Sequence, residues 1–142
     1  RLLGYDAKVV PGADDNRLIA LALKEGRVLL TRDTQIMLRR IVTIGKLKAL
    51  LVQVDDPKLQ LNQVVTAMGL SFNYGPFTRC LECNQPLVIL GKEDAQGLVP
   101  PYVFTTQTEF KQCSACKRIY WRGTHWQNMN REIEQLKAET GL

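Results

Sequence analysis

Residues 14–33 read DDNRLIALALKEGRVLLTRD, a helix pattern followed directly by a strand pattern. Leu18, Ile19, Ala22 and Leu23 recur at helical spacing, which predicts a helix over residues 15–25 with these side chains buried and Gly26 as its stop. Residues 27–31, with apolar residues at positions 28–30, then predict a strand. A helix joined to an apolar strand by a short loop is typical of α/β proteins.

The same alternation continues on both sides of this stretch. Strands are expected at residues 7–10 and 49–54, and helices at residues 34–42 and 57–68. The last of these helices has an apolar face that includes Leu59. Short apolar strands that alternate with helices predict a parallel sheet covered by helices.

The character of the sequence changes after residue 70, where residues 71–76 are loop-like. Four cysteines and short aromatic, strand-like pieces follow, and the chain closes with a polar helical pattern. The sequence therefore predicts an α/β domain over residues 1–70, a small β-rich unit over residues 77–126 and a C-terminal helix over residues 127–142. Residues 92–101, which end in paired prolines, are expected to be an inserted loop.

The composition is that of a folded globular chain, with 45% hydrophobic and 23% charged residues among 142. The longest apolar run covers residues 18–23, far short of the ~20 residues that a membrane span needs. The net charge of +5 is compatible with a polyanionic partner, but an ordinary solvated surface explains it equally well.

The cysteines form two C-x2-C pairs, Cys80 with Cys83 and Cys113 with Cys116. Two such pairs supply four thiolates for one tetrahedral zinc ion, and a site with four cysteines is structural because no position stays open. Asn84 and Lys117 follow the pairs, where each chain segment must bend. A thiol–disulfide redox pair and simple disulfides are the alternatives.

Aspartates follow each predicted strand of the first domain: Asp14 and Asp15, then Asp33, then Asp55 and Asp56. Carboxylates that converge at the carboxyl edge of a parallel sheet suit Mg²⁺ or Mn²⁺, ions that activate water and stabilise a leaving oxygen. The alternative is that these residues cap helices, as an aspartate before a proline at position 57 would do.

Residues 14–33 resemble the second half of PIN-type nuclease domains, in which an acid opens an alanine-rich helix and a strand ends in Thr-x-Asp. Together with the segments at residues 2–7 and 120–126 and the cysteine pairs, they resemble the Mut-seven C-terminal RNase family. That family joins a PIN-like domain to a zinc ribbon.

The resemblance implies metal-dependent cleavage of RNA. Asp15 and Asp33 fall on the family's acidic positions, and Asp14 is a neighbour able to substitute. Asp55 and Asp56 match a family acidic pair to which we assign no role. Family domains begin with a strand that ends in an aspartate. This chain starts after that strand, so residues 1–70 are expected to lack the first strand and to hold the catalytic ion poorly.

A basic and aromatic segment follows the second cysteine pair. Arg118, Tyr120, Arg122 and Trp126 are expected to bind RNA, because guanidinium groups neutralise phosphates and aromatic rings stack on unpaired bases. Strand alternation would place Arg118, Tyr120 and Arg122 on one face, with residues 119 and 121 on the other. Packing of these rings within the protein is the alternative, and His125 is expected to be an ordinary surface or packing residue.

These observations favour a ribonuclease with a catalytic Mg²⁺ or Mn²⁺, a structural zinc ribbon and single-stranded RNA as its partner. The alternative is a non-catalytic module that binds nucleic acid or supports assembly. Cysteines suited to zinc and the lack of a targeting segment favour the cytoplasm. Nothing in the sequence predicts the oligomeric state.

Overall fold

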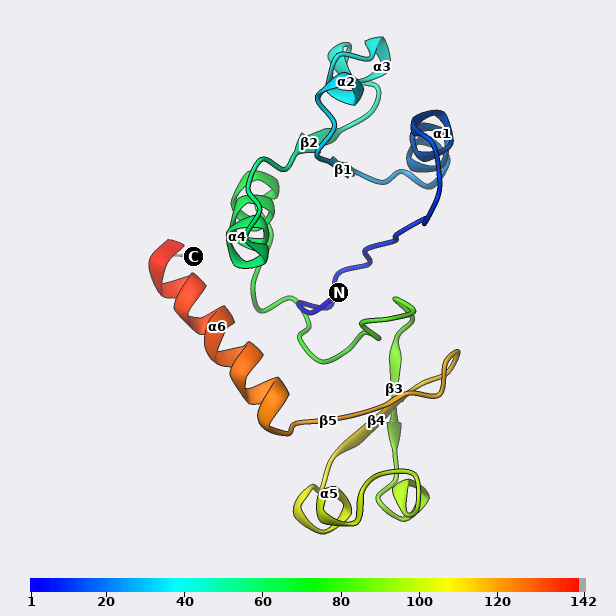
Figure 1. Ribbon diagram of the computed structural model, residues 1–142, viewed down its shortest axis with the longest axis vertical. Helices are drawn as coiled ribbons and strands as arrows, with labels where there is room; N and C mark the ends of the chain where they lie inside the picture. The colour runs from blue at the N-terminus through cyan, green and yellow to red at the C-terminus, as the bar shows by residue number, and fades with distance from the viewer. Residues whose placement is uncertain (141–142) are drawn as a thin grey trace. The chain divides into compact units, whose positions relative to one another are not determined.

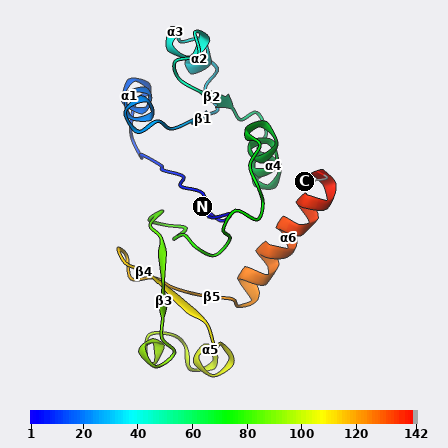
Figure 2. The ribbon, with the colours of Figure 1, turned by 180° about the vertical axis from the view of Figure 1, so that it is seen from behind.

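The computed structural model describes residues 1–140, which form two compact units. One unit contains residues 9–70, and the other contains residues 1–8 together with the chain from residue 71 onward. The first holds a small parallel sheet and the second an antiparallel sheet and the C-terminal helix (Figures 1 and 2). The predicted fold class, a mixed α/β chain followed by a β-rich cysteine unit, is confirmed.

The unit of residues 9–70, here the α/β unit, alternates helices and strands. Its elements are α1 (Asp15–Glu25), β1 (Leu29–Thr31), α2 (Thr34–Met37), α3 (Arg40–Thr43), β2 (Ala49–Leu51) and α4 (Pro57–Met68). Strands β1 and β2 pair in parallel, with Leu29 opposite Ala49 and Thr31 opposite Leu51. The predicted parallel pairing is therefore confirmed, although both strands are shorter than expected.

Local sequence signals set the ends of the two long helices of this unit. Asp14 and Asp56 accept hydrogen bonds from the first backbone N–H groups of α1 and α4, and Pro57 occupies the first turn of α4. Gly26 and Gly69 end these helices in the left-handed conformation, with φ of 63° and 61°. Both helices have the predicted bounds.

Three expectations for the α/β unit are wrong. Residues 7–10 form no strand, because the Ala7 N–H donates to the Asn84 side chain rather than to a neighbouring strand. The helix expected over residues 34–42 is split into α2 and α3, because Arg39 has an extended backbone with ψ of 135°. Leu23 and Leu59 were expected to be buried but are 42% and 51% exposed.

The second unit, here the ribbon unit, is built on a three-stranded antiparallel sheet. Its elements are β3 (Leu87–Leu90), the short 3-10 helix η1 (Glu93–Ala95), α5 (Pro101–Thr106), β4 (Phe110–Cys113), β5 (Ile119–Trp121) and α6 (Thr124–Thr140). The strand order is β3-β4-β5, with Leu87 opposite Cys113 and Phe110 opposite Trp121.

The hydrophobic core of the ribbon unit lies between this sheet and the segment that joins β3 to β4. Phe110 is fully buried with Ala95 and Val99, and Ile119 and Trp121 pack against them. The loop expected over residues 92–101 instead contains η1 and leads into α5, which starts at Pro101. Proline is well suited to that first helical position because its missing N–H would have no helical partner there.

Within the described residues 1–140, none of the helices combines the length and apolar character needed to cross a bilayer.

Candidate metal centre and nucleic-acid surface

The four cysteine sulfurs of the ribbon unit come together at one point. The Sγ atoms of Cys80, Cys83, Cys113 and Cys116 all lie within 4.8 Å of one another. Among residues 1–140, this is the sole group of three or more histidine, cysteine or acidic side chains with that proximity. Four thiols around one point are the donor set of a structural zinc ion, so the predicted metal site fits the structure.

The two cysteine pairs sit in turns of matching geometry. The Asn84 N–H donates to the Cys80 carbonyl at 2.9 Å, and the Lys117 N–H donates to the Cys113 carbonyl at 3.0 Å. Asn84 and Lys117 both have positive φ, 64° and 62°, which lets the chain reverse after each pair. Both predicted bends are confirmed. Each turn therefore directs two sulfurs to the same side of the backbone.

The sheet brings the two turns together. The first turn precedes β3, and the second connects β4 to β5. Because Leu87 pairs with Cys113, the start of β3 lies beside the end of β4. Cys80 and Cys113 are fully buried, whereas Cys116 is exposed. One side of the sulfur cluster thus faces the protein interior and the other faces solvent.

Hydrogen bonds prepare one sulfur for metal binding. Burial opposes ionisation of Cys80, but the Tyr120 hydroxyl and the backbone N–H groups of Cys83 and Glu82 outweigh it and lower the pKa of Cys80 to about 6. The hydrogen bond shared with Cys116 is the main cause that raises the pKa of Cys83 to about 12. Cys80 would therefore meet a zinc ion as a thiolate, and Cys83 would release a proton to bind it.

Tyr120 connects β5 to the metal site. Its hydroxyl lies 3.1 Å from Cys80 Sγ and accepts a hydrogen bond from the Leu81 N–H at 3.2 Å. Burial, followed by the hydrogen bond with Cys80, raises the pKa of Tyr120 to about 12. The phenol is therefore a proton donor to the Cys80 sulfur at neutral pH, and it orients a metal ligand from outside the cluster.

Replacing Tyr120 with Phe is expected to weaken zinc binding by at least tenfold, because groups that hold a metal ligand contribute roughly 10–100-fold to affinity. Competition with a chromophoric chelator measures the change. Tyr102→Phe is the matched control, since Tyr102 is 77% exposed and lies on α5. Equal zinc affinity of the wild type and Tyr120→Phe would show that the hydroxyl does not hold the ligand.

The N-terminal segment supports the first cysteine turn. Arg1 donates from Nη1 to the Leu81 and Glu82 carbonyls, at 2.7 and 2.8 Å. Arg79 donates to the carbonyls of Gly4 and Asn84, at 3.1 and 2.6 Å. Neither arginine is among the site residues predicted from the sequence. The position of Arg79 directly before Cys80 was the one available signal.

The candidate catalytic carboxylates lie in the α/β unit, and most of them cap helices. Asp14 accepts from the Arg17 N–H, Asp33 from the Gln35 N–H at 2.7 Å, and Asp56 from two N–H groups of α4. Capping was the predicted alternative for these three residues, and the structure confirms it. Capping uses Oδ1 of each carboxylate, and all three residues are exposed.

The ends of the two parallel strands lie close together. Arg32, after β1, forms an ion pair with Asp55, after β2, so Asp33 belongs to a loop in contact with the Asp55 loop. Asp15 is half-buried at the start of α1, and no hydrogen bond to its carboxylate is found in the described chain. Within the described residues 1–140, no three of these acids lie close enough together to form a metal-binding group. Magnesium, however, uses one or two protein carboxylates plus substrate phosphates, so the donor chemistry fits.

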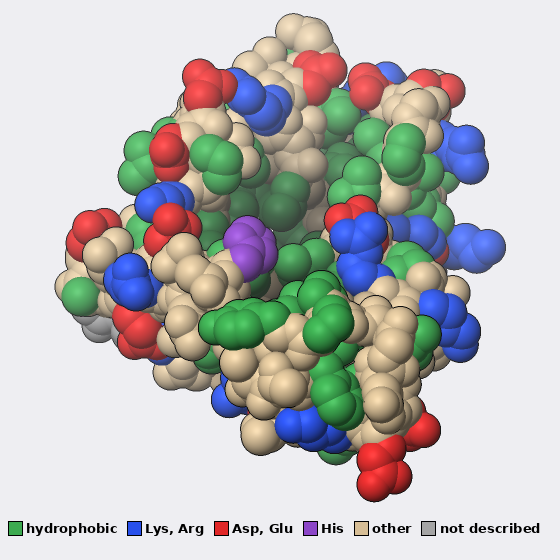
Figure 3. Space-filling view, turned by 60° about the horizontal axis from the view of Figure 1, so that its bottom comes forward, with side chains coloured by type: hydrophobic (Ala, Val, Ile, Leu, Met, Phe, Trp, Pro, Cys, Tyr) green, Lys and Arg blue, Asp and Glu red, His purple; other side chains and the backbone are tan. Residues whose placement is uncertain are grey.

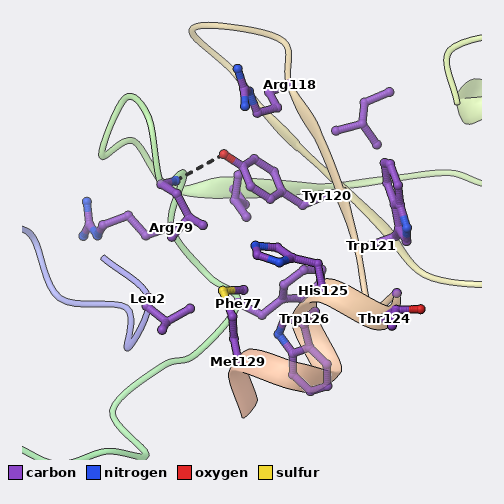
Figure 4. Close-up of a pocket in the computed structure, with 14 residues that line it drawn as sticks. Leu2, Phe77, Arg79, Arg118, Tyr120, Trp121, Thr124, His125, Trp126 and Met129 are labelled. Carbon is purple, nitrogen blue, oxygen red and sulfur yellow. Dashed lines mark hydrogen bonds between the residues drawn. The ribbon is translucent and has the colours of Figure 1, made fainter. Parts of the chain in front are cut away.

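A cavity of about 390 Å³ lies in the ribbon unit, beside β5 and the start of α6 (Figure 4). Three of the four residues expected to bind RNA line it: Arg118, Tyr120 and Trp126. The remaining lining residues are Leu2, Phe77, Arg79, Leu81, Leu87, Ile119, Trp121, Gly123, Thr124, His125 and Met129. His125 is exposed, as expected, among hydrophobic side chains (Figure 3).

The fourth expected RNA-binding residue, Arg122, packs against aromatic rings. Its guanidinium lies 5.5 Å from the Phe77 ring centre and 5.0 Å from that of Trp126. It also pairs with Glu109 at 3.7 Å. The alternation expected along β5 is present, since Ile119 and Trp121 pack on the core while the Tyr120 hydroxyl reaches Cys80.

The chain thus combines a small parallel sheet that has acids at its carboxyl edge with a four-cysteine ribbon that has a basic and aromatic cavity. The family model described as the Mut7-C RNAse domain matches residues 1–133, so the chain belongs to that family. No curated protein and no solved structure matches the chain. Family membership points to a nuclease or nucleic-acid-related function with RNA as substrate, and the cysteine cluster can hold a metal such as zinc.

Proposed function

We propose that the chain is a ribonuclease that cleaves RNA with the help of Mg²⁺ or Mn²⁺. The observation that carries this proposal is the match to an RNase family over nearly the whole chain, residues 1–133. In this proposal Asp15 and Asp33 hold the ion, with Asp14 as a neighbour able to contribute. The bound ion would supply an activated water and stabilise the leaving oxygen of the phosphodiester.

The geometry of the α/β unit supports the assignment of Asp33. The residue follows the carboxyl end of β1, the position at which open parallel sheets bind ligands. Its Oδ1 is used by the cap of α2, which fixes the side chain and leaves Oδ2 for an ion. Arg32 next to it is exposed and pairs with Asp55, a surface pair weak enough for a phosphate to displace.

The ribbon unit would hold the RNA strand. Its zinc ion would keep the two cysteine turns together, and Arg118, Tyr120, Arg122 and Trp126 would contact the RNA. Arg118 is exposed and pairs with Glu82 at 3.5 Å, a surface pair weak enough for a phosphate to displace. Single-stranded RNA is the proposed form because aromatic side chains stack on bases that are not paired.

Asp33→Asn is expected to abolish cleavage of labelled single-stranded RNA in the presence of Mn²⁺. Asparagine caps helices as well as aspartate does, so α2 and the fold should persist while the charge that binds the ion is lost. Asp94→Asn, which removes an exposed charge from the ribbon unit, is the control. Cleavage at equal rates by contaminant-free preparations of the wild type and Asp33→Asn would reject Asp33 as a catalytic residue.

A second function, a module that binds RNA without cleaving it, is favoured by the capping role of Asp14, Asp33 and Asp56. It predicts RNA binding that weakens as salt rises and no turnover with any divalent ion. The wild-type reaction above separates the two functions, because binding without cleavage by zinc-loaded protein would leave the binding module as the function.

A further inference from the structure

We propose that the cavity of the ribbon unit is a binding site for one unstacked nucleobase of an RNA strand, with the adjoining phosphate held by Arg118. The proposal rests on the proposed function in taking RNA as the ligand, and it adds a site and a mode of recognition. Every lining residue belongs to the ribbon unit, so the site is complete within that unit.

The charge of the lining favours a nucleotide over a cation or a basic peptide. Arg79 and Arg118 line the cavity, and no carboxylate of the described residues 1–140 does. The guanidinium of Arg79 is partly buried and fixed by the carbonyls of Gly4 and Asn84. Arg118 is exposed at the rim, where its partner Glu82 is also exposed. Arg79 is held by backbone carbonyls, and the surface pair of Arg118 with Glu82 is weak enough for a phosphate to displace, so these two guanidinium groups suit a ligand that carries a phosphate.

The shape and lining favour a flat ring as the part that enters. The volume of about 390 Å³ lies in the range of small-molecule sites. The Tyr120, His125 and Trp126 rings all line the cavity, and Figure 4 shows His125 between the other two rings, with Met129 and Leu2 to one side. Aromatic walls with apolar neighbours bind every nucleobase through its π face, at roughly 1–3 kcal/mol per stacked base.

The walls of the cavity are held in place before any ligand arrives. The Tyr120 hydroxyl is anchored by Cys80 and by the Leu81 N–H. Trp126 is held by Phe77, at 5.9 Å between ring centres, and by the guanidinium of Arg122. His125 is the exposed wall, so its ring can be changed without disturbing the core. Walls that are already ordered lose little conformational entropy on binding.

The test compares the Kd of two proteins for each of two probes. The proteins are the zinc-loaded wild type and His125→Ala, and the probes are a single-stranded RNA and a ribose-phosphate strand of equal length without bases. Fluorescence anisotropy gives each Kd. We expect the wild type to bind the base-bearing strand about tenfold more tightly than the abasic strand, and His125→Ala to lose most of that difference. Binding of the abasic strand should be equal for both proteins.

Two further variants complete the test. His125→Phe, which keeps a ring, should restore the preference for bases, and Tyr102→Ala, an exposed ring on α5, should leave it unchanged. Tight RNA binding with the same base preference in the wild type and His125→Ala would overturn the nucleobase site while leaving RNA binding intact. Absence of RNA binding by the wild type would overturn both the site and the proposed function.

Discussion

Cys113→Ser is expected to abolish stoichiometric zinc binding and the cooperative folding of the ribbon unit. Cys113 is fully buried and ends β4, so its loss removes a ligand and leaves a hydroxyl where a thiolate should meet the ion. Structural zinc supplies roughly 10–16 kcal/mol to small domains at neutral pH, which is comparable to the roughly 5–15 kcal/mol that separates a folded domain from its unfolded state. A chelator added to the wild type should have the same effect.

Two measurements check this expectation. Metal analysis should find about one zinc per wild-type chain and far less in the variant, and hydrogen exchange should rise across residues 77–126 but not across residues 15–68. Ser114→Ala, an exposed position in the same turn, is the control. A wild type that folds without zinc and holds its cysteines as a reversible disulfide would favour the redox alternative.

Gly4→Ala is expected to destabilise the ribbon unit by about 3 kcal/mol or more. Gly4 has φ of 90°, and an added Cβ would lie 2.2 Å from the Gly75 carbonyl oxygen. The backbones meet here because the Gly75 N–H donates to the Leu3 carbonyl. The substitution adds the cost of a left-handed conformation, about 1–2 kcal/mol, to a clash with backbone atoms that have no room to rotate away.

The variant Gly97→Ala measures the cost of the left-handed backbone conformation without the clash. Gly97 also has positive φ, 78°, but nothing lies within 4 Å of an added Cβ. Urea denaturation of both variants should show a small decrease in the free energy of unfolding for Gly97→Ala and a larger decrease for Gly4→Ala. Equal decreases in the free energy of unfolding for the two variants would mean that residues 1–8 do not pack against the Gly75 segment as described.

Features that depend on neighbours in the chain could be predicted from the sequence. Asp56 followed by Pro57 gives both the start and the cap of α4, and Gly69 gives its end. The two cysteine turns could be predicted for the same reason, since the bend at Asn84 follows directly from the spacing of Cys80 and Cys83. The alternation along β5 belongs to this group as well.

Features that depend on distant residues could not be predicted. The hydrogen bonds that join Arg1 to the turn after Cys80 leave no periodic pattern in either segment. Helix α5 was missed because a pair of prolines resembles a loop until the second one is placed at a helix start. Leu23 completes an apolar stripe in the sequence, but its exposure depends on which parts of the chain cover α1.

The candidate acidic site shows the same limit. The sequence indicates that Asp33 follows a strand, and this is confirmed. It does not indicate that Arg32 would bind Asp55, because that ion pair depends on the register between β1 and β2. A capping role and an ion-binding role require the same residue at the same place, so the pattern alone leaves both open for Asp33.

The position of Tyr120 couples two binding equilibria that are usually measured separately, the binding of zinc by the cysteines and the binding of a ligand in the cavity. Its ring forms part of the cavity wall, and its hydroxyl holds the Cys80 sulfur. By thermodynamic reciprocity, any factor by which bound zinc strengthens binding in the cavity must equal the factor by which an occupied cavity strengthens zinc binding. If that factor exceeds one, a ligand in the cavity would raise the equilibrium affinity for zinc, and a falling zinc supply would first affect molecules whose cavities are empty.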